Sequence, residues 1–400
     1  MTNNSKGPLS GLKVLEMGSL IAGPFAAKTL GDFGADIIKI EAPGVGDPLR
    51  SWRTAEGTTS VWWHVQARNK KSVAIDLRQK EGQDLVRRLA CEADIVIENF
   101  RPGTLEKWGL DYDTLAALNT ALIMLRISGY GQSGPMRDLA GFGVVAEAMG
   151  GLRYITGMPG EAPVRPGISI GDSLSALHGV IGVLLALYHR SANGGSGQMI
   201  DVALYESVFN MMEGAVPEYD RHRMIREPAG SAIQGIAPTN AYPCADGRYV
   251  LVAGNGDRIY QRLMSLIGRD DLGTEPALAR NPGRVQHMAR IDAAISAWTM
   301  TRSLEECLEV LAQSGVPAGK VYTVKDIVED EHYAARDMLP TVTLNDGSTL
   351  KVSGVVPKLS ATPGRVAGGG PDLGQHTESV LASLGIDAAA MQLLREKGVI

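Results

Sequence analysis

The chain has 400 residues, a formal net charge of −5, 44% hydrophobic residues and 21% charged residues. This is the composition of an ordinary globular protein, and its mild acidity disfavours general nucleic-acid binding. The length exceeds the size at which a single hydrophobic core usually stops growing, so we expect more than one domain.

Cysteines and terminal segments bear on the cellular compartment. Cys91, Cys244 and Cys307 stand singly, without the spacing of metal ligands. An odd number of isolated cysteines favours a reducing compartment, and each is expected to be a small buried hydrophobic residue. Residues 1–6 lack the apolar core of a signal peptide, and the longest apolar run, 180–188, is too short to span a bilayer. We expect a cytoplasmic protein with no metal site and no membrane partner.

The first half of the chain alternates strands and helices. Strands are expected at residues 13–17, 36–41, 72–76, 94–98 and 121–127, and helices at 23–33 and 80–91. Pro24 suits the first turn of its helix, where its missing N–H has no partner to lose. Alternation at this spacing predicts parallel βαβ units. The expected fold class is therefore α/β, with a Rossmann-like, doubly wound large domain.

The strand at 121–127 leads into Gly129, Gly131 and Gly134, which match the G-x-G-x-x-G pattern of dinucleotide sites. In that pattern the last glycine opens a helix, whereas Pro135 follows here and the next helix is expected at 143–150. No G-x-x-x-x-G-K-[ST] loop occurs, so ATP-driven chemistry has no phosphate cradle. A nucleotide-binding oxidoreductase is therefore an alternative function that Pro135 disfavours.

Asp172 follows Gly171 at the start of a helical apolar pattern that runs to about residue 189. One hypothesis is a helix cap, since an aspartate there accepts a backbone N–H bond and stabilises the helix by about 1 kcal/mol. The other is that the amides and the helix dipole keep the carboxylate ionised where a ligand reaches it. Such a carboxylate is a nucleophile that needs no base of its own.

Beyond this helix the pattern changes. A strand is expected at 198–202 and a helix at 205–212, and a charged, irregular passage marks a domain boundary near residue 225. Asp246 and Gly247 form the turn of a hairpin with strands at 239–243 and 248–253. Helices are expected at 259–267, 290–299 and 304–314, then a hairpin over 341–352 and a helix at 378–384. Residues 226–330 thus form a smaller α+β domain, after a large domain at 1–225.

Four segments taken together resemble the class III coenzyme A transferases of the CaiB/BaiF type, nearly end to end. They are the opening strand pair, IENFRPG at 97–103, Gly171-Asp172 and GQHT at 374–377. The family includes formyl-CoA transferase, crotonobetainyl-CoA transferase and alpha-methylacyl-CoA racemase. The resemblance implies an acyl-CoA:carboxylate CoA-transferase that forms a covalent intermediate on Asp172. A non-catalytic acyl-CoA binder is the alternative from another class of function. It also implies no permanently bound cofactor, acyl-CoA and a carboxylic acid as partners, and an interlocked homodimer in which residues 331–400 complete the large domain.

The resemblance assigns further site residues. Gly254 and Gly256 match a glycine loop whose amides stabilise the developing oxyanion, with an ordinary turn as the alternative. Among the positions that match the family's CoA site, the cations Arg78, Arg101 and Lys107 can neutralise phosphates. Each of them alone also fits a solvated surface charge. The positions that match the CoA site are Ala22, Ile75, Asp76, Leu77, Arg78, Asn99, Phe100, Arg101 and Lys107.

Departures from the family bear on the substrate. Ile21 stands where formyl-CoA transferase has a glutamine near the acyl group, and Ala42 where it has an arginine at the adenine, which puts formyl-CoA and oxalate specificity in doubt. Phe142 occupies the position of the racemase's histidine, and a phenylalanine transfers no proton, so a racemase is the disfavoured alternative. His178 is expected to be a packed helix residue.

The acceptor acid has a weaker signal. Residues 235–240 are similar to the branch of the family that uses succinyl-CoA and a dicarboxylate. Arg221, Arg223 and Arg226 nearby offer cationic partners for a second carboxylate.

Overall fold

The computed structural model describes residues 7–53, 55–56 and 59–400, so the expectation about a signal peptide at residues 1–6 lies outside the described residues. The chain divides into two compact units. The first extends to Leu152 and includes Pro166–Glu213 and His332–Ile400, and the second comprises Arg153–Arg165 and Gly214–Glu331. The smaller domain was expected at residues 226–330. The second unit begins 12 residues earlier, at Gly214, and also includes residues 153–165.

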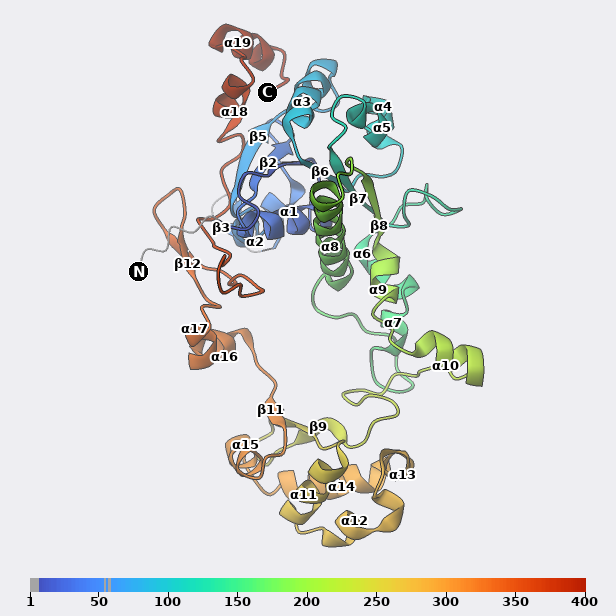
Figure 1. Cartoon of the computed structure of the whole chain (residues 1–400). Helices are drawn as coiled ribbons and strands as arrows, with labels where there is room; N and C mark the ends of the chain where they lie inside the picture. Colours follow the sequence, from blue (N-terminus) through green and yellow to red (C-terminus); the bar gives the residue numbers. More distant parts are fainter. Residues whose placement is uncertain (1–6, 54, 57–58) are drawn as a thin grey trace. The chain divides into compact units, whose positions relative to one another are not determined.

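A six-stranded parallel sheet forms the centre of the first unit (Figure 1). All five strand pairings are parallel, which confirms the expected α/β fold with a parallel sheet. The chain builds outward in one direction from β1 and in the other from β6, so strand order reverses between these two neighbours. Ligands of such sheets bind beyond the carboxyl ends of the strands at this reversal. The strand order is β5 (Lys70–Ala74), β2 (Asp36–Glu41), β1 (Lys13–Glu16), β6 (Ile95–Glu98), β7 (Ile123–Ser128) and β8 (Met199–Ala203).

Helices cover both faces of this sheet, as its runs of buried apolar residues require. Val14 faces a core shared with α1 (Ala22–Asp32) and α8 (Ile170–Ala192). Leu15, on the opposite face, contributes to a core shared with α3 (Lys80–Glu92), α18 (Thr377–Ser383) and α19 (Ala388–Glu396). Helix α18, the second-last helix of the chain, lies beside β5 (Figure 1). The last residues of the chain therefore belong to the core of the first unit.

Helix α8 corrects two expectations. It begins at Ile170 with Ser169 as its N-cap residue, so Asp172 is the third residue of the helix and not its cap. It is 23 residues long and contains an 18-residue window of mean hydropathy 1.7, so by length and composition it is long and apolar enough to cross a membrane. The expectation that no run reaches that length is therefore wrong. In this protein Ala176 and Val183 of the helix are buried in the core of the first unit.

The other elements of the first unit are short. Two helices span limits of this unit: the chain first leaves it within α7 (Leu152–Ile155) and last re-enters it within α17 (Glu331–Ala335). The remainder are η1 (Pro48–Ser51), β3 (Ala55–Glu56), β4 (Thr59–Ser60), α2 (Val61–Gln66), α4 (Thr104–Trp108), α5 (Tyr112–Ala116), α6 (Gly143–Met149), α9 (Leu204–Phe209), β12 (Thr341–Thr343) and β13 (Thr349–Lys351).

The second unit combines a small sheet with helices. The expected hairpin, β9 (Thr239–Pro243) and β10 (Tyr249–Ala253), gains β11 (Ala318–Lys320) as a third antiparallel strand. The helices expected at 259–267, 290–299 and 304–314 correspond to α11, α14 and α15. The helical segments are α10 (Ala215–His222), α11 (Asp257–Leu266), α12 (Asp270–Thr274), η2 (Pro276–Leu278), α13 (Asn281–Gln286), α14 (Met288–Thr299), α15 (Leu304–Gln313) and α16 (Val324–Glu329).

The cysteines divide between core and surface. Cys244 and Cys307 are buried in the core of the second unit, with their sulfur atoms 4.0 Å apart. Cys91 is exposed, so the expectation that it is buried is wrong. It lies in the last turn of α3, whose buried positions Leu85, Val86 and Leu89 occupy another side of the helix.

Candidate active site

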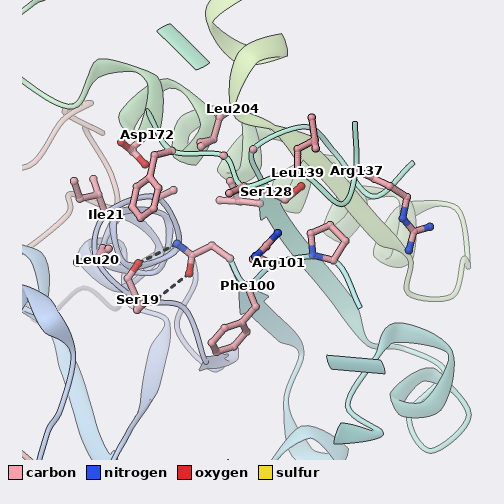
Figure 2. Close-up of a pocket in the computed structure, with 18 of the residues that line it drawn as sticks. Ser19, Leu20, Ile21, Phe100, Arg101, Ser128, Arg137, Leu139, Asp172 and Leu204 are labelled. Carbon is pink, nitrogen blue, oxygen red and sulfur yellow. Dashed lines mark hydrogen bonds between the residues drawn. The ribbon is translucent and has the colours of Figure 1, made fainter. Parts of the chain in front are cut away.

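A cavity of about 340 Å³ lies at the carboxyl ends of β1, β6 and β7 (Figure 2). Its walls are residues 19–22 after β1, residues 99–102 after β6, residues 127–129 at the end of β7, and the loop from Arg137 to Phe142. Asp172, from the first turn of α8, also lines it. The cavity lies where the reversal of strand order predicts a ligand site. It brings Asp172 together with Ala22, Asn99, Phe100 and Arg101 of the expected site.

The carboxylate of Asp172 lies against the backbone at the start of α6. A Cβ atom added to Gly143, the first residue of that helix, would lie 2.2 Å from Oδ2 of Asp172. That distance is far below van der Waals contact, so only glycine fits beside the carboxylate in this position. Asp172 is half-buried, and its place in the first turn of α8 puts it where the helix dipole favours an anion.

Phe142, directly before Gly143, lines the same cavity and has 61% of its surface exposed. As expected from its position, the cavity has a hydrocarbon ring where the racemase branch has a histidine. Nδ1 of His178 lies 3.0 Å from the carbonyl oxygen of Leu174 in its own helix. His178 therefore behaves as a packed helix residue.

A second cavity, of about 200 Å³, contains most of the other expected CoA positions. Ile75, Asp76, Leu77 and Arg78 line it after β5, together with Ala42. Phe100 and Ser19 line both cavities. The ring of Phe100 packs edge-on against Trp108, with centroids 5.4 Å apart. The second cavity therefore lies next to the cavity of Asp172, with Ser19 and Phe100 between them.

Two of the expected CoA residues are placed differently from the rest. The side-chain amide of Asn99 is engaged by the protein: Oδ1 accepts from the N–H of Ser19 at 2.8 Å and Nδ2 donates to its carbonyl at 2.9 Å. Lys107 is exposed on α4 and lines neither cavity. Asn99 thus fixes a wall of the first cavity, and Lys107 lies outside both.

The cations of the site differ in their partners. The side chain of Arg78 is 80% exposed and donates through Nε to Oδ1 of Asp76 at 2.9 Å. This hydrogen bonding lowers the pKa of Asp76 to about 2. Arg101 donates to the carbonyl of Asp138 at 2.9 Å and so holds the loop after β7. Arg137, on that loop, also lines the first cavity, and its guanidinium points away from Asp172 (Figure 2).

Two residues of the site, Arg137 and Glu98, were assigned no role from the sequence. Oε2 of Glu98 accepts from the N–H of Phe100 at 2.7 Å, and Oε1 accepts from Nε of Arg126 at 2.7 Å. Glu98 is fully buried, and burial raises the pKa of its carboxyl to about 7. It orients the turn that carries Phe100 into both cavities. For Glu98, the available signal was a charged residue at the end of an otherwise apolar strand. For Arg137, it was a cation in a glycine-rich loop.

The glycine loop of the second unit lies between β10 and α11. The N–H of Gly254 donates to the carbonyl of Pro238 at 2.9 Å, and a Cβ there would lie 2.7 Å from Cδ2 of Leu263. Packing therefore accounts for glycine at 254. Gly256 is the N-cap residue of α11, and Arg284 donates to the carbonyl of Asn255 at 2.7 Å.

Comparison with known proteins covers nearly the whole chain. A family model described as CoA-transferase family III matches residues 9–377. A succinyl-CoA–D-citramalate CoA-transferase of Chloroflexus aurantiacus is 47% identical over 395 residues, 98% of each chain. A succinate–glutarate CoA-transferase of Agrobacterium fabrum is 34% identical over 95% of this chain and 96% of its own. The crystal structure of a CaiB/BaiF family protein from Brucella suis has a TM-score of 0.83 at 34% identity and covers 95% of this chain and 100% of that one.

Proposed function

Because this chain belongs to CoA-transferase family III, we propose that it moves CoA from succinyl-CoA to a dicarboxylate through a covalent intermediate on Asp172. Membership confirms the resemblance seen in the sequence, and the chain is a CoA-transferase. The observation that carries the proposed mechanism is the position of Asp172 in a cavity at the reversal of strand order, next to a second cavity with which it shares Ser19 and Phe100. Relatives named as succinyl-CoA transferases support the donor.

The proposed reaction has two symmetrical halves. A carboxylate oxygen of Asp172 attacks the thioester carbonyl, the C–S bond breaks, and a mixed anhydride and CoA thiolate form. The thiolate then attacks the aspartyl carbonyl, and succinate leaves. The acceptor carboxylate attacks the resulting aspartyl-CoA thioester, and the thiolate attacks the acceptor carbonyl of the second anhydride to free Asp172. One thioester replaces another, so the exchange needs no ATP, and the covalent intermediate divides it into smaller steps.

Other residues of this chain bind the substrate and stabilise charge in the proposed mechanism. The proposed attack of Asp172 uses a carboxylate oxygen and needs no general base. Ala22 and Phe100 form walls for the thioester arm, and Arg78, Arg101 and Lys107 are proposed partners of the CoA phosphates. The N–H of Gly254 already donates to the carbonyl of Pro238. The proposed oxyanion role of the glycine loop therefore depends on the amides of Asn255 and Gly256.

The cationic side chain of Arg78 gives a prediction about the CoA phosphates. Arg78→Gln should raise KM for succinyl-CoA by about threefold to fivefold, the scale of an exposed ion pair, and leave kcat nearly unchanged. Succinyl-pantetheine, which lacks the nucleotide, should show no such change. Lys80→Gln removes an exposed charge on the same unit outside both cavities and is the matched control. An equal rise in KM for both thioesters would exclude a phosphate contact.

The proposed acceptor is a dicarboxylate. Relatives named for citramalate, malate and glutarate support this class, as do residues 235–240. Arg226 donates to both oxygens of Glu218, at 2.7 and 2.8 Å, so Arg221 and Arg223 are the proposed partners of the second carboxylate. Citramalate, malate and glutarate should exceed acetate and butyrate in kcat/KM, measured with succinyl-CoA, acetyl-CoA and formyl-CoA as donors. Monocarboxylates that outcompete every dicarboxylate would refute this acceptor class.

We also propose a homodimer, interlocked as the family resemblance implies. One side of α8 exposes Leu177, Ile181, Leu185 and Tyr188, by 44%, 54%, 65% and 67%. A continuous apolar stripe of this kind is typical of an interface. Light scattering at micromolar concentration should give twice the chain mass of 42.5 kDa. A species at the mass of a single chain under those conditions would contradict the dimer.

A cytoplasmic location is the proposed cellular setting. Cys244 and Cys307 are both thiols, although their sulfur atoms are only 4.0 Å apart in a buried core. Neighbouring thiols that stay unlinked fit a reducing compartment.

A further inference from the structure

Residues 18–24 lead from β1 into α1, and we call them the β1 wall because residues 19–22 among them line the first cavity. Its backbone is held by side chains from other parts of the first unit. Lys39 donates to the carbonyl of Gly18 at 2.8 Å, and Lys70 donates to that of Pro24 at 2.8 Å. Asn99 and Gln66 engage the backbone between them. The wall is therefore fixed by specific polar contacts along its whole length.

Leu20 is the strained residue of the β1 wall. Its φ is 64°, in the left-handed region that residues other than glycine rarely adopt. The N–H of Leu20 donates to both carboxylate oxygens of Asp47, at 3.1 and 3.2 Å. Asp47 also accepts from the N–H of Leu49, at 2.9 Å. A residue in such a conformation persists only where its surroundings hold it, and Asp47 is the group that holds the Leu20 amide.

Buried charges keep Asp47 ionised for this contact. Nζ of Lys39 lies 2.9 Å from Oδ2 of Asp47 and 2.8 Å from Glu16, and Lys70 lies 2.7 Å from the other oxygen of Glu16. Burial acts to raise the pKa of Asp47, but the charge of Lys39 and the backbone hydrogen bonds outweigh it and lower that pKa below its usual value. Buried ion networks seldom add net stability. A role in fixing the backbone accounts for this one better.

We propose that Asp47 is a positioning residue of the transfer reaction: it holds Leu20 in the left-handed conformation and so fixes the wall against which the acyl group meets Asp172. The inference rests on the proposed function. Asp47 also lines the second cavity, but its side chain is only 1% exposed, and its carboxylate is engaged by the amides of Leu20 and Leu49 and by Lys39. Its proposed action is therefore through the backbone of Leu20. Leu20 and Ile21 line the cavity of Asp172 and not the second cavity. Loss of the contact should therefore lower the rate of acyl transfer more than the affinity for CoA.

The test pairs Asp47→Asn with two changes at Leu20. Asp47→Asn should lower kcat by about tenfold or more, the scale of a small misplacement at a reacting centre. Leu20→Gly and Leu20→Ala remove the same side chain, but only glycine adopts positive φ freely. In the Asp47→Asn background the glycine variant should therefore keep a kcat several-fold above the alanine variant, whereas the two should be similar beside native Asp47. Equal kcat values for the two double variants would overturn the proposal.

Leu20→Pro tests the proposal without altering the buried charges. Proline has no N–H and fixes φ near −65°. The substitution therefore removes the hydrogen-bond donor of residue 20 and leaves the carboxylate of Asp47 unchanged. We expect kcat to fall at least about tenfold, with the circular dichroism spectrum retained and the Kd for CoA, measured by calorimetry, unchanged within about twofold. A kcat equal to that of Leu20→Ala would overturn the proposal. A wild-type enzyme that transfers CoA from none of the tested donors would instead refute the proposed function itself.

Discussion

Replacing Asp172 by asparagine should lower kcat with succinyl-CoA by at least about 10³, because it removes the attacking oxygen and the anion but keeps the shape of the side chain. The fold should survive, since Asp172 is the third residue of α8 and Ser169 is its N-cap residue. The measurements are steady-state kinetics and thermal unfolding of the same preparations.

A matched control separates this effect from helix capping. Asp111 is the N-cap residue of α5, where its carboxylate accepts from the N–H of Thr114 at 3.1 Å, and it lines neither cavity. Asp111→Asn should lower the free energy of unfolding slightly, by no more than about 1 kcal/mol, with kcat retained. If Asp172→Asn behaves in the same way, the carboxylate of Asp172 is structural and the proposed mechanism is wrong.

Replacing Gly143 by alanine should reduce kcat by about 10², because the added methyl group would stand 2.2 Å from Oδ2 of Asp172 and displace the carboxylate. The melting temperature should change little. Gly143 is helical, where alanine is intrinsically favoured over glycine by about 1 kcal/mol, and the obstructing atom is the end of a side chain that can turn away. Loss of activity without loss of stability is the expected signature of a displaced nucleophile.

Gly167→Ala is the control for this substitution. Gly167 precedes Asp172 by five residues, and a Cβ added there would meet no atom within 4 Å. Its activity and stability should match those of the wild type. A Gly143→Ala enzyme with wild-type kcat would mean that the position of the Asp172 carboxylate against α6 does not matter for the reaction.

The sheet and the nucleophile could be predicted from the sequence because both depend on local patterns. Parallel strands buried on two faces are continuous apolar runs, and each expected strand of the sheet lies within a few residues of its observed position. Asp172 could be identified because Gly171 precedes it and a helical pattern of apolar residues follows it. Short helices such as α4 and α5 gave no comparable signal, because about five residues are too few to display helical periodicity.

The sequence could not show which side chains from distant parts of the chain bind each other in the folded protein. Asn99 matches a CoA position by motif, yet its amide is paired with Ser19, 80 residues earlier. The fit of Gly143 against Asp172 and the contact of Asp47 with Leu20 likewise join segments that only the folded sheet brings together. Lys107 belongs to the motif but lines neither cavity. Each case depends on side-chain geometry that propensity and spacing do not encode.

Trapping the covalent intermediate on Asp172 tests the proposed mechanism. Wild-type enzyme is incubated with succinyl-CoA and no acceptor, treated with hydroxylamine, digested and analysed by mass spectrometry, with Asp172→Asn processed in parallel. An activated aspartyl carbonyl reacts with hydroxylamine, so the wild-type peptide that contains Asp172 should carry a hydroxamate, and the variant peptide should not. A fully active wild-type enzyme that carries no modification at Asp172, or carries it on another residue, would exclude Asp172 as the nucleophile.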